Sequence, residues 1–437
     1  MRRKIYDKLL EWKKQETNIK PLMILGARQV GKTYIINEFC QNEFENYVHI
    51  NLFENKEIIK LYQSEKNSYE KYLEFQLLMN FDFDTPNSVI FIDEIQECEE
   101  LISELKYFCE KHNQVRIICA GSLLGVKLKR SKSSFPVGKV NMYYMYPMDF
   151  EEFLIALHQE MLVDKIKECY EQDVELYSTL HERALNLYRL YLCVGGMPES
   201  VNHIVLVERD IMKYDSQIIA QIIDSYFKDM DKYVSSNAEE LKIERIYDSI
   251  PTQLLNSSNK FQFSKIVSGA KSRDYDTALD WLLASSMILK SNLVSTPEIP
   301  LKGFVKNDYF KLFLNDVGIL TRMLKLRYAD LLMDKVSLYK GAIAENYVAN
   351  QLVQNGMDLY YWQSNGIAEI DFLLYTDDGI IPIEVKAGDS VKAKSLKVYM
   401  DKFEPSYAIR ISTRNFGYDS NKKIKSVPLY AVFCIQD

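Results

Sequence analysis

The chain has 437 residues, of which 47% are hydrophobic and 26% are charged, and its formal net charge is −7 at pH 7. This length corresponds to about three domains, and the apolar fraction excludes an intrinsically disordered chain. The negative net charge excludes a globally basic nucleic-acid-binding protein, so any contact with DNA would need a local basic patch.

The cysteines and histidines predict neither a disulfide framework nor a structural metal site. The seven cysteines include no CxxC pair, and the five histidines lie far apart. No run of apolar residues approaches the ~18 that a membrane span needs, and the charged N-terminus is followed by an amphipathic helix pattern instead of a signal sequence. We therefore expect a cytoplasmic protein without membrane contact.

The first chemical motif is a glycine-rich segment that follows the apolar run 22–25. Its residues are Gly26, Ala27, Arg28, Gln29, Val30, Gly31, Lys32 and Thr33. A strand, this segment and a helix over 34–39 form a P-loop, in which backbone N–H groups surround phosphates and Lys32 reaches the β/γ oxygens. Thr33 would supply a hydroxyl to Mg²⁺. A purely structural turn is the alternative.

A second motif about 60 residues later favours the nucleotide site over that alternative. The run 88–92 is short, apolar and typical of a strand, and it ends in Asp93 and Glu94. In a P-loop ATPase, Asp93 would hold the Mg²⁺ shell, and Glu94 would be the general base that polarises the attacking water. The two motifs together predict binding of ATP and Mg²⁺.

The first 150 residues are predicted to form an α/β domain with a parallel, doubly wound sheet. Apolar runs at 47–52 and 115–122 alternate with helical patterns, which is typical of such sheets. Ser122 would lie at the C-terminal end of the strand after the Walker B strand. There it could contact the γ-phosphate or water, or simply belong to a turn, and the sequence leaves both readings open.

Two segments of mostly helical character follow. A helical lid is expected over 151–234, where the break at 195–198 interrupts helices; a lid turn that approaches adenine is the alternative for this break. The segment 235–330 combines short helices with strands near 288–290 and 309–313, which predicts a winged-helix-like module. Its alternative is an adaptor without DNA contact, favoured because the segment is not notably basic.

The segment 331–437 returns to an α/β pattern and carries a second set of acids. Asp371, Glu384 and Lys386 lie on two predicted strands, and Glu345 lies on the preceding helix. Two carboxylates on Mg²⁺ with a lysine that positions water would suit phosphodiester hydrolysis, with Glu345 completing the metal shell. An exposed hairpin with ordinary ion pairs is the alternative. The lysines that follow would line a phosphate track or form a solvated helix face.

Over essentially its whole length, the chain resembles prokaryotic AAA-type ATPases that end in a restriction-endonuclease-like, PD-(D/E)XK-type domain of unknown function. The matching segments, besides the C-terminal acids, are 26–33, 90–96, 121–125, 134–138, 149–153 and 195–198. The resemblance implies that Lys32 and Thr33 bind phosphate and Mg²⁺, that Asp93 and Glu94 are the Walker B acid and base, and that Ser122 is the sensor. It also implies an arginine supplied by a neighbouring copy, for which Arg130 is the candidate.

The sequence thus predicts a Mg²⁺-dependent ATPase whose nucleotide cycle controls a nuclease-like domain, with DNA as the substrate of that domain. The first alternative is a nucleotide-switched scaffold with structural C-terminal acids, which would work with a protein partner or as a homo-oligomer. The second keeps the ATPase but makes the C-terminal domain a DNA-binding relic.

Overall fold

The computed structural model describes residues 1–122, 135–232, 237–255, 260–335, 339–364, 368–388 and 394–436. The chain forms two compact units. The N-terminal unit comprises Arg2–Tyr146 with Ala284–Ser286, and the C-terminal unit comprises Met1, Pro147–Leu283 and Met287–Asp437. The three segments expected after residue 150 therefore lie in one unit. Arg130 lies outside the described residues. Of the described helices, none is both long enough and apolar enough to cross a membrane.

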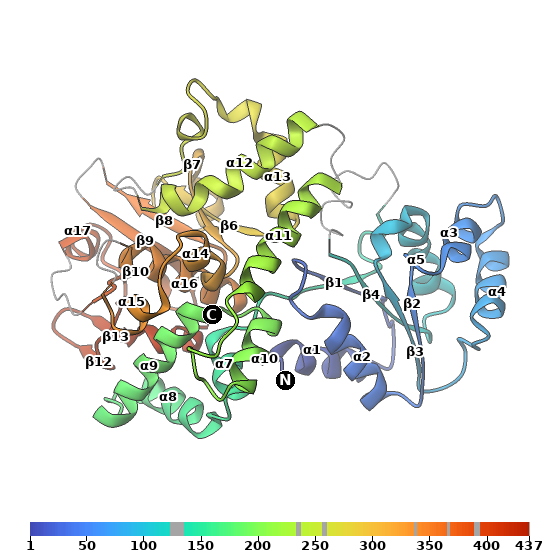
Figure 1. Ribbon diagram of the computed structural model, residues 1–437, viewed down its shortest axis with the longest axis horizontal. Coiled ribbons are helices and arrows are strands. Elements are labelled where there is room, and N and C mark those ends of the chain that lie inside the picture. The colour runs from blue at the N-terminus through green and yellow to red at the C-terminus, as the bar shows by residue number, and fades with distance from the viewer. Residues whose placement is uncertain are drawn as a thin grey trace. The chain divides into compact units, whose positions relative to one another are not determined.

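The N-terminal unit contains a five-stranded sheet in the order β2-β3-β4-β1-β5, and all of its neighbouring strands are parallel (Figure 1). The strands are β1 (Leu22–Leu25), β2 (Asn46–Asn51), β3 (Ser88–Asp93), β4 (Arg116–Ala120) and β5 (Asn141–Tyr144). The central strands β1 and β3 are buried along their whole length, as expected for short apolar runs in a parallel sheet. The predicted parallel α/β fold is confirmed, and β4 separates the P-loop strand from the Walker B strand.

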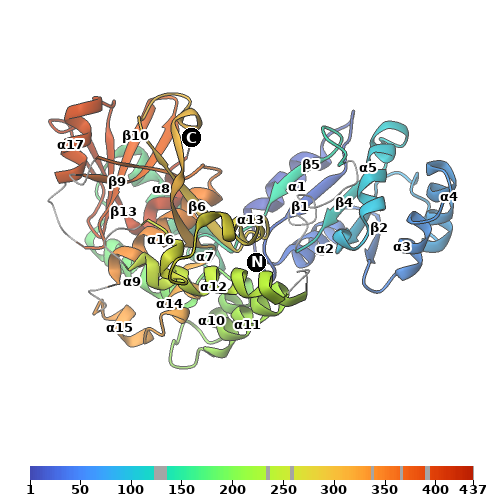
Figure 2. The ribbon, with the colours of Figure 1, turned by 90° about the horizontal axis from the view of Figure 1, so that it is seen from above.

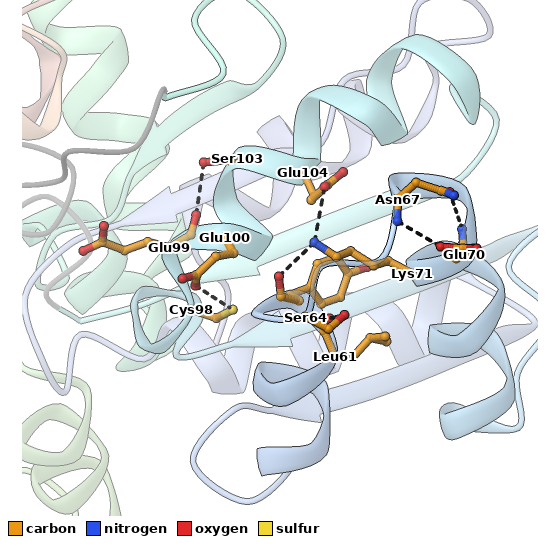
Figure 3. Close-up of polar contacts among 11 residues, drawn as sticks. Leu61, Ser64, Asn67, Glu70, Lys71, Cys98, Glu99, Glu100, Ser103 and Glu104 are labelled. Atoms are coloured by element: carbon orange, nitrogen blue, oxygen red, sulfur yellow. Dashed lines mark hydrogen bonds and ion pairs between the residues drawn. The ribbon is translucent and has the colours of Figure 1, made fainter.

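Five described helices surround this sheet. They are α1 (Lys4–Lys13), α2 (Lys32–Glu43), α3 (Lys56–Tyr62), α4 (Ser68–Met79) and α5 (Glu99–Lys111). Apolar side chains of α3, α4 and α5 pack with alternate residues of the strands in one buried cluster. The buried Lys71 of α4 donates from Nζ to the carbonyl of Tyr62 in α3, and the same Nζ lies 3.9 Å from Oε1 of Glu104 in α5 (Figure 3). This side chain therefore connects α3, α4 and α5.

The C-terminal unit combines helices with a second sheet. Its described helices are α7 (Phe150–Ala156), α8 (Glu160–Gln172), α9 (Ser178–Val194), α10 (Pro198–Leu206), α11 (Gln217–Lys232), α12 (Asn237–Leu254), α13 (Asp276–Ala284), α14 (Val317–Met323), α15 (Tyr328–Leu332), α16 (Lys340–Gln354) and α17 (Lys394–Phe403). The expected helix break at 195–198 separates α9 from α10, and a buried carboxylate holds it. Asp316 accepts the N–H of Gly196 at 2.6 Å and the N–H of Ile319 at 3.0 Å. The Gly-Gly-Met-Pro segment therefore packs inside this unit.

The second sheet has eight strands in the order β12-β13-β11-β10-β9-β8-β6-β7 and is mixed. The strands are β6 (Ile288–Val294), β7 (Val305–Leu314), β8 (Tyr360–Gln363), β9 (Glu369–Thr376), β10 (Gly379–Val385), β11 (Ala408–Ser412), β12 (Gly417–Asp419) and β13 (Ile424–Pro428). Helix α17 contacts β9 and β10, and α16 contacts β7 and β10. Figures 1 and 2 show these two helices on opposite sides of the strands.

The expected hairpin near 288–313 is present as β6 and β7, but it does not stand apart as the wing of a separate module. Strand β6 pairs in parallel with β8, with Asn292 opposite Tyr360 and Val294 opposite Trp362. The hairpin therefore extends the sheet of the following segment across the boundary expected at residue 330. Fully buried amides also secure this edge, since Asn346 of α16 bonds both the N–H and the carbonyl of Leu314.

Candidate functional site

The glycines of the P-loop allow a turn that L side chains would obstruct. Gly26 has a φ of 145°, and a Cβ there would lie 2.1 Å from the carbonyl oxygen of Met145. The N–H of Met145 donates to the carbonyl of Leu25 at 2.8 Å, which fixes this close approach. Gly31 has a φ of 91° and precedes the first turn of α2. The left-handed backbone there turns the chain into the helix, whose free N–H groups can receive an anion.

Lys32 is folded into the loop that precedes it. Its side chain is buried, and Nζ donates to the carbonyls of Gly26 at 2.8 Å and Ala27 at 2.7 Å. The ammonium group therefore lies inside the turn, next to the N-terminus of α2. A fixed cation at a helix N-terminus is suited to a phosphate chain, because both contribute positive potential at the same place.

Thr33 and Asp93 meet at the end of this loop. The hydroxyl of Thr33 donates to Oδ2 of Asp93 at 2.7 Å, and the N–H of Glu94 donates to Oδ1 of Asp93 at 3.0 Å. The structure thus brings together the two residues predicted to hold Mg²⁺. A hydroxyl and a carboxylate are hard oxygen donors of the kind that Mg²⁺ takes from a protein, so these residues fit the ion.

Glu94 occupies a strained backbone position directly after β3. Its φ is 54° and its ψ is 41°, a left-handed conformation that is uncommon for a residue with a side chain. Its half-buried carboxylate accepts a hydrogen bond from the amide of Gln96, which is fully buried in the 3₁₀ turn Ile95–Glu97. Strain of this kind persists where surrounding contacts enforce it, as is common at functional sites.

Ser122 follows β4, the strand that lies between β1 and β3. Its hydroxyl accepts a hydrogen bond of 3.4 Å from Nε of Arg28 in the P-loop. This hydrogen bond connects the end of β4 to the P-loop.

The acids of the C-terminal unit surround a buried lysine that the sequence did not single out. Lys311 of β7 has a side chain only 1% exposed, and its Nζ lies 2.6 Å from Glu369 and 3.4 Å from Glu345. Burial opposes its charge, but the carboxylates of Glu345, Glu369 and Asp371 outweigh that effect and raise the pKa of Lys311. This part of the acid set therefore has its countercharge within the chain.

Asp371 lies at a β-bulge. Tyr360 pairs with Leu373 and Trp362 pairs with Ile370, so two residues of β9 face one residue of β8 between these pairs. Oδ2 of Asp371 accepts the N–H of Val385 at 2.7 Å. Burial, reinforced by Glu345, raises the pKa of Asp371 to about 8, while Lys311 and the Val385 N–H act in the opposite direction. The bulge lies on the β8 side of β9; on the other side, β9 pairs with β10 in regular antiparallel register, from Gly379 opposite Thr376 to Ile383 opposite Phe372.

Glu384 and Lys386 form a neighbouring ion pair at the end of β10. Lys386 Nζ lies 2.9 Å from Oε1 of Glu384, whose side chain is 2% exposed, and Oε2 of Glu384 has no hydrogen-bond partner among the described residues. Within the described ranges, no group of three or more His, Cys, Asp or Glu side chains is arranged to hold a metal ion. Glu345, which was expected to complete a metal shell with Asp371 and Glu384, lies 3.4 Å from Nζ of Lys311.

Comparison with protein families matches three parts of the chain. Residues 18–154 match a family described as an AAA domain. The N-terminal unit carries an AAA-type P-loop ATPase domain. Residues 185–330 and 340–432 match two different domains of unknown function, DUF8612 and DUF4143. The first of these two ranges ends at residue 330 and the second begins at residue 340, near the domain boundary predicted from the sequence. The second sheet nevertheless includes strands from both sides of that boundary.

Individual proteins similar to the chain are distant. An uncharacterized protein of Methanocaldococcus jannaschii is 23% identical over 411 residues, which covers 91% of this chain and 81% of that protein. The Walker-type ATPase of Pyrococcus abyssi is 15% identical, with a TM-score of 0.45, and covers 74% of this chain and 96% of its own. The Holliday junction branch migration motor RuvB of Thermotoga maritima is 14% identical, with a TM-score of 0.30, and covers 68% and 90% respectively.

Two further residues contact the site of the AAA-type domain. Arg3 is buried and donates to the carbonyls of Val30 at 2.9 Å and Tyr146 at 2.7 Å, so it braces the P-loop from outside. His49 of β2 places Nε2 3.8 Å from Oδ2 of Asp93 and stacks on Phe91. No sequence motif marks either residue, because both act through contacts between segments that are distant in the chain.

Proposed function

We propose that the protein is a Mg²⁺-dependent ATPase in which Lys32 holds the β- and γ-phosphates and Glu94 orients the attacking water. The observation that carries this proposal is the convergence of Lys32, Thr33, Asp93 and Glu94 at the C-terminal edge of one parallel sheet. Mg²⁺ held by Thr33 and Asp93 would neutralise charge on the phosphate oxygens.

The chemical step follows from the positions of these groups. The water oxygen forms a bond to the γ-phosphorus while the bond from that phosphorus to the β,γ-bridging oxygen breaks, which leaves ADP and phosphate. Glu94 accepts a hydrogen bond from the water and takes its proton, which then passes to the released phosphate. Ser122, attached to the P-loop through Arg28, would report whether the γ-phosphate is present.

Nucleotide binding and phosphate release by purified variants test this proposal. Lys32→Ala should abolish binding or turnover, whereas Glu94→Gln should bind ATP and stall. Lys60→Ala and Glu57→Gln are matched controls, because both residues are exposed on α3 of the same unit. Unchanged turnover by Glu94→Gln would contradict the assignment of the base.

For the C-terminal unit, we propose a nuclease-like domain controlled by the nucleotide cycle, acting on DNA through Asp371, Glu384 and Lys386. The buried, unpartnered Oε2 of Glu384 favours this role, because an orphaned carboxylate oxygen is costly without a ligand. Its alternative is a nucleotide-switched scaffold with structural acids and a protein partner or second copy. Lys311 favours that alternative, because it already forms ion pairs with Glu345 and Glu369.

Incubation with plasmid and linear DNA separates the two roles. The assay contains Mg²⁺ or Mn²⁺, with and without ATP, and compares wild type with Glu384→Ala and Lys32→Ala. Cutting that is lost in Glu384→Ala supports the nuclease, and its dependence on Lys32 then tests control by ATP. ATP hydrolysis without cutting in any condition supports the scaffold.

A further inference from the structure

Gln96 lies where it can determine the orientation of Glu94. Its side chain is fully buried, and Nε2 donates to Oε2 of Glu94. The 3₁₀ turn Ile95–Glu97 holds the backbone between them, with the N–H of Glu97 donating to the carbonyl of Glu94 at 3.0 Å and the N–H of Cys98 donating to that of Ile95 at 3.1 Å. The amide is thus fixed, while the carboxylate that it contacts is half-buried.

Stability alone does not account for an amide at this position. Oε1 of Gln96 is buried and has no hydrogen-bond partner among the residues that the structure describes. Burial of an unsatisfied carbonyl oxygen is destabilising, which offsets the stabilisation that the Nε2 hydrogen bond contributes. An apolar side chain of the same length would avoid this cost. The hydrogen bond to Glu94 is therefore the feature that distinguishes Gln96 from an apolar residue at this position.

We infer that Gln96 is a positioning residue for ATP hydrolysis, which holds one oxygen of Glu94 so that the other accepts a hydrogen bond from the attacking water. This inference rests on the ATPase function proposed above. A glutamate with three rotatable bonds samples many orientations, and a single fixed donor removes most of them before the substrate arrives. The left-handed backbone of Glu94 fixes the direction in which its side chain leaves the chain, and the hydrogen bond from Gln96 fixes the orientation of its carboxylate.

Gln96→Met tests this role, because methionine keeps the length of the side chain and removes the donor. The expected result is a fall in kcat for ATP of about tenfold or more, with KM and the affinity for a fluorescent ATP analogue changed less than about threefold. Gln76→Met is the matched control: the Gln76 side chain in the same unit bonds the N–H of Phe83 at 3.0 Å and should leave kcat unchanged.

Gln96→Glu supplies a second readout, measured at each pH on protein that circular dichroism shows to be folded, because a charged carboxylate buried here would also weaken the fold. The new carboxyl group can donate to Glu94 only when it is protonated, so turnover relative to wild type should rise as the pH falls from 8 to 6. A flat ratio across this range would contradict positioning by a donor. This variant also decides the question if Gln96→Met fails to fold.

The outcomes distinguish failure of the role of Gln96 from failure of the proposed ATPase function. Absence of ATP hydrolysis by wild-type protein would overturn the ATPase proposal itself. Hydrolysis by wild type together with an unchanged or increased kcat in folded Gln96→Met would overturn the role of Gln96 alone. A lower kcat with preserved nucleotide affinity, partly restored at low pH in Gln96→Glu, would support it.

Discussion

The hydroxyl of Thr33 lies 2.7 Å from Oδ2 of Asp93, although 60 residues separate them in the sequence. Asp93 ends β3, and Thr33 lies in the first turn of α2, which follows β1; the two strands are not neighbours, because β4 lies between them. The C-terminal ends of parallel strands lie at one edge of a sheet, so a residue that ends one strand can contact a residue in the segment after another strand. This contact supports the first of four predictions.

Asp93→Asn should remove Mg²⁺-dependent turnover while nucleotide binding without Mg²⁺ persists. Asparagine keeps the shape of the side chain and an acceptor for the Glu94 N–H, but it loses the charge that favours the ion. We expect a fall in kcat on the order of a hundredfold or more, measured by phosphate release over a Mg²⁺ titration. Asp7→Asn, at an exposed position of α1, is the control. Equal Mg²⁺ dependence in both variants would contradict the assignment.

Gly26→Ala should destabilise the N-terminal unit and abolish nucleotide binding, because its Cβ would lie 2.1 Å from the backbone oxygen of Met145. Gly138→Ala is the matched control, since Gly138 also has a positive φ, of 73°, but a Cβ there meets nothing within 4 Å. In the control, left-handed strain alone should lower the free energy of unfolding by about 1–2 kcal/mol, and Gly26→Ala should lower it by more. Thermal unfolding with and without ATP measures both, and equal losses would argue against the close approach.

Lys311→Met should destabilise the C-terminal unit by about 3–5 kcal/mol, because it leaves buried carboxylates without their countercharge. Adding Glu369→Gln should recover part of that loss. Lys306→Met is the control, since Lys306 is exposed on the same strand. Denaturant unfolding measures all three variants. A neutral effect of Lys311→Met would mean that the acids have another countercharge, such as a bound cation.

The stability of the C-terminal unit should fall as pH rises from about 4 to about 8, through Asp371. Its pKa is raised to about 8 in the folded state, whereas an unfolded aspartate titrates near ~3.9. The folded state therefore binds the extra proton in this range, and stability decreases with pH, by a few kcal/mol at most.

Asp371→Asn should remove this part of the pH dependence, because asparagine remains neutral and still offers an oxygen to the Val385 N–H. Melting temperatures of wild type and variant between pH 5 and 8.5 provide the measurement. The difference between the two proteins isolates Asp371 from other titrating groups. A difference that does not change with pH would contradict the raised pKa.

The local motifs of the AAA-type domain, the P-loop and the Walker B strand, could be predicted from the sequence. The P-loop and the Walker B strand are each set by a few consecutive residues, such as Gly26, Gly31 and the run that ends at Asp93. Their backbone geometry follows from residue type and period, so the parallel sheet could be predicted. The C-terminal acids could also be assigned to two strands and a helix, but the buried Lys311 beside Glu345 could not be predicted.

The sequence signal for Lys311 is weak: it is a lysine within an apolar strand, and such a lysine is seldom buried without charged partners. Gln96 had no signal of its own beyond its place in the Walker B motif.

The sequence by itself determined which segments become strands, helices and phosphate-binding turns, because those choices depend on neighbours within a few residues. Only the tertiary structure decided that β6 and β7 join the sheet of β8–β10, that Lys311 pairs with Glu345 and Glu369, and that Arg3 braces the P-loop. Each of these features pairs groups that are distant in the chain. Their pairing is set by the packing of whole elements, which fixes where a buried charge or a free strand edge finds its partner.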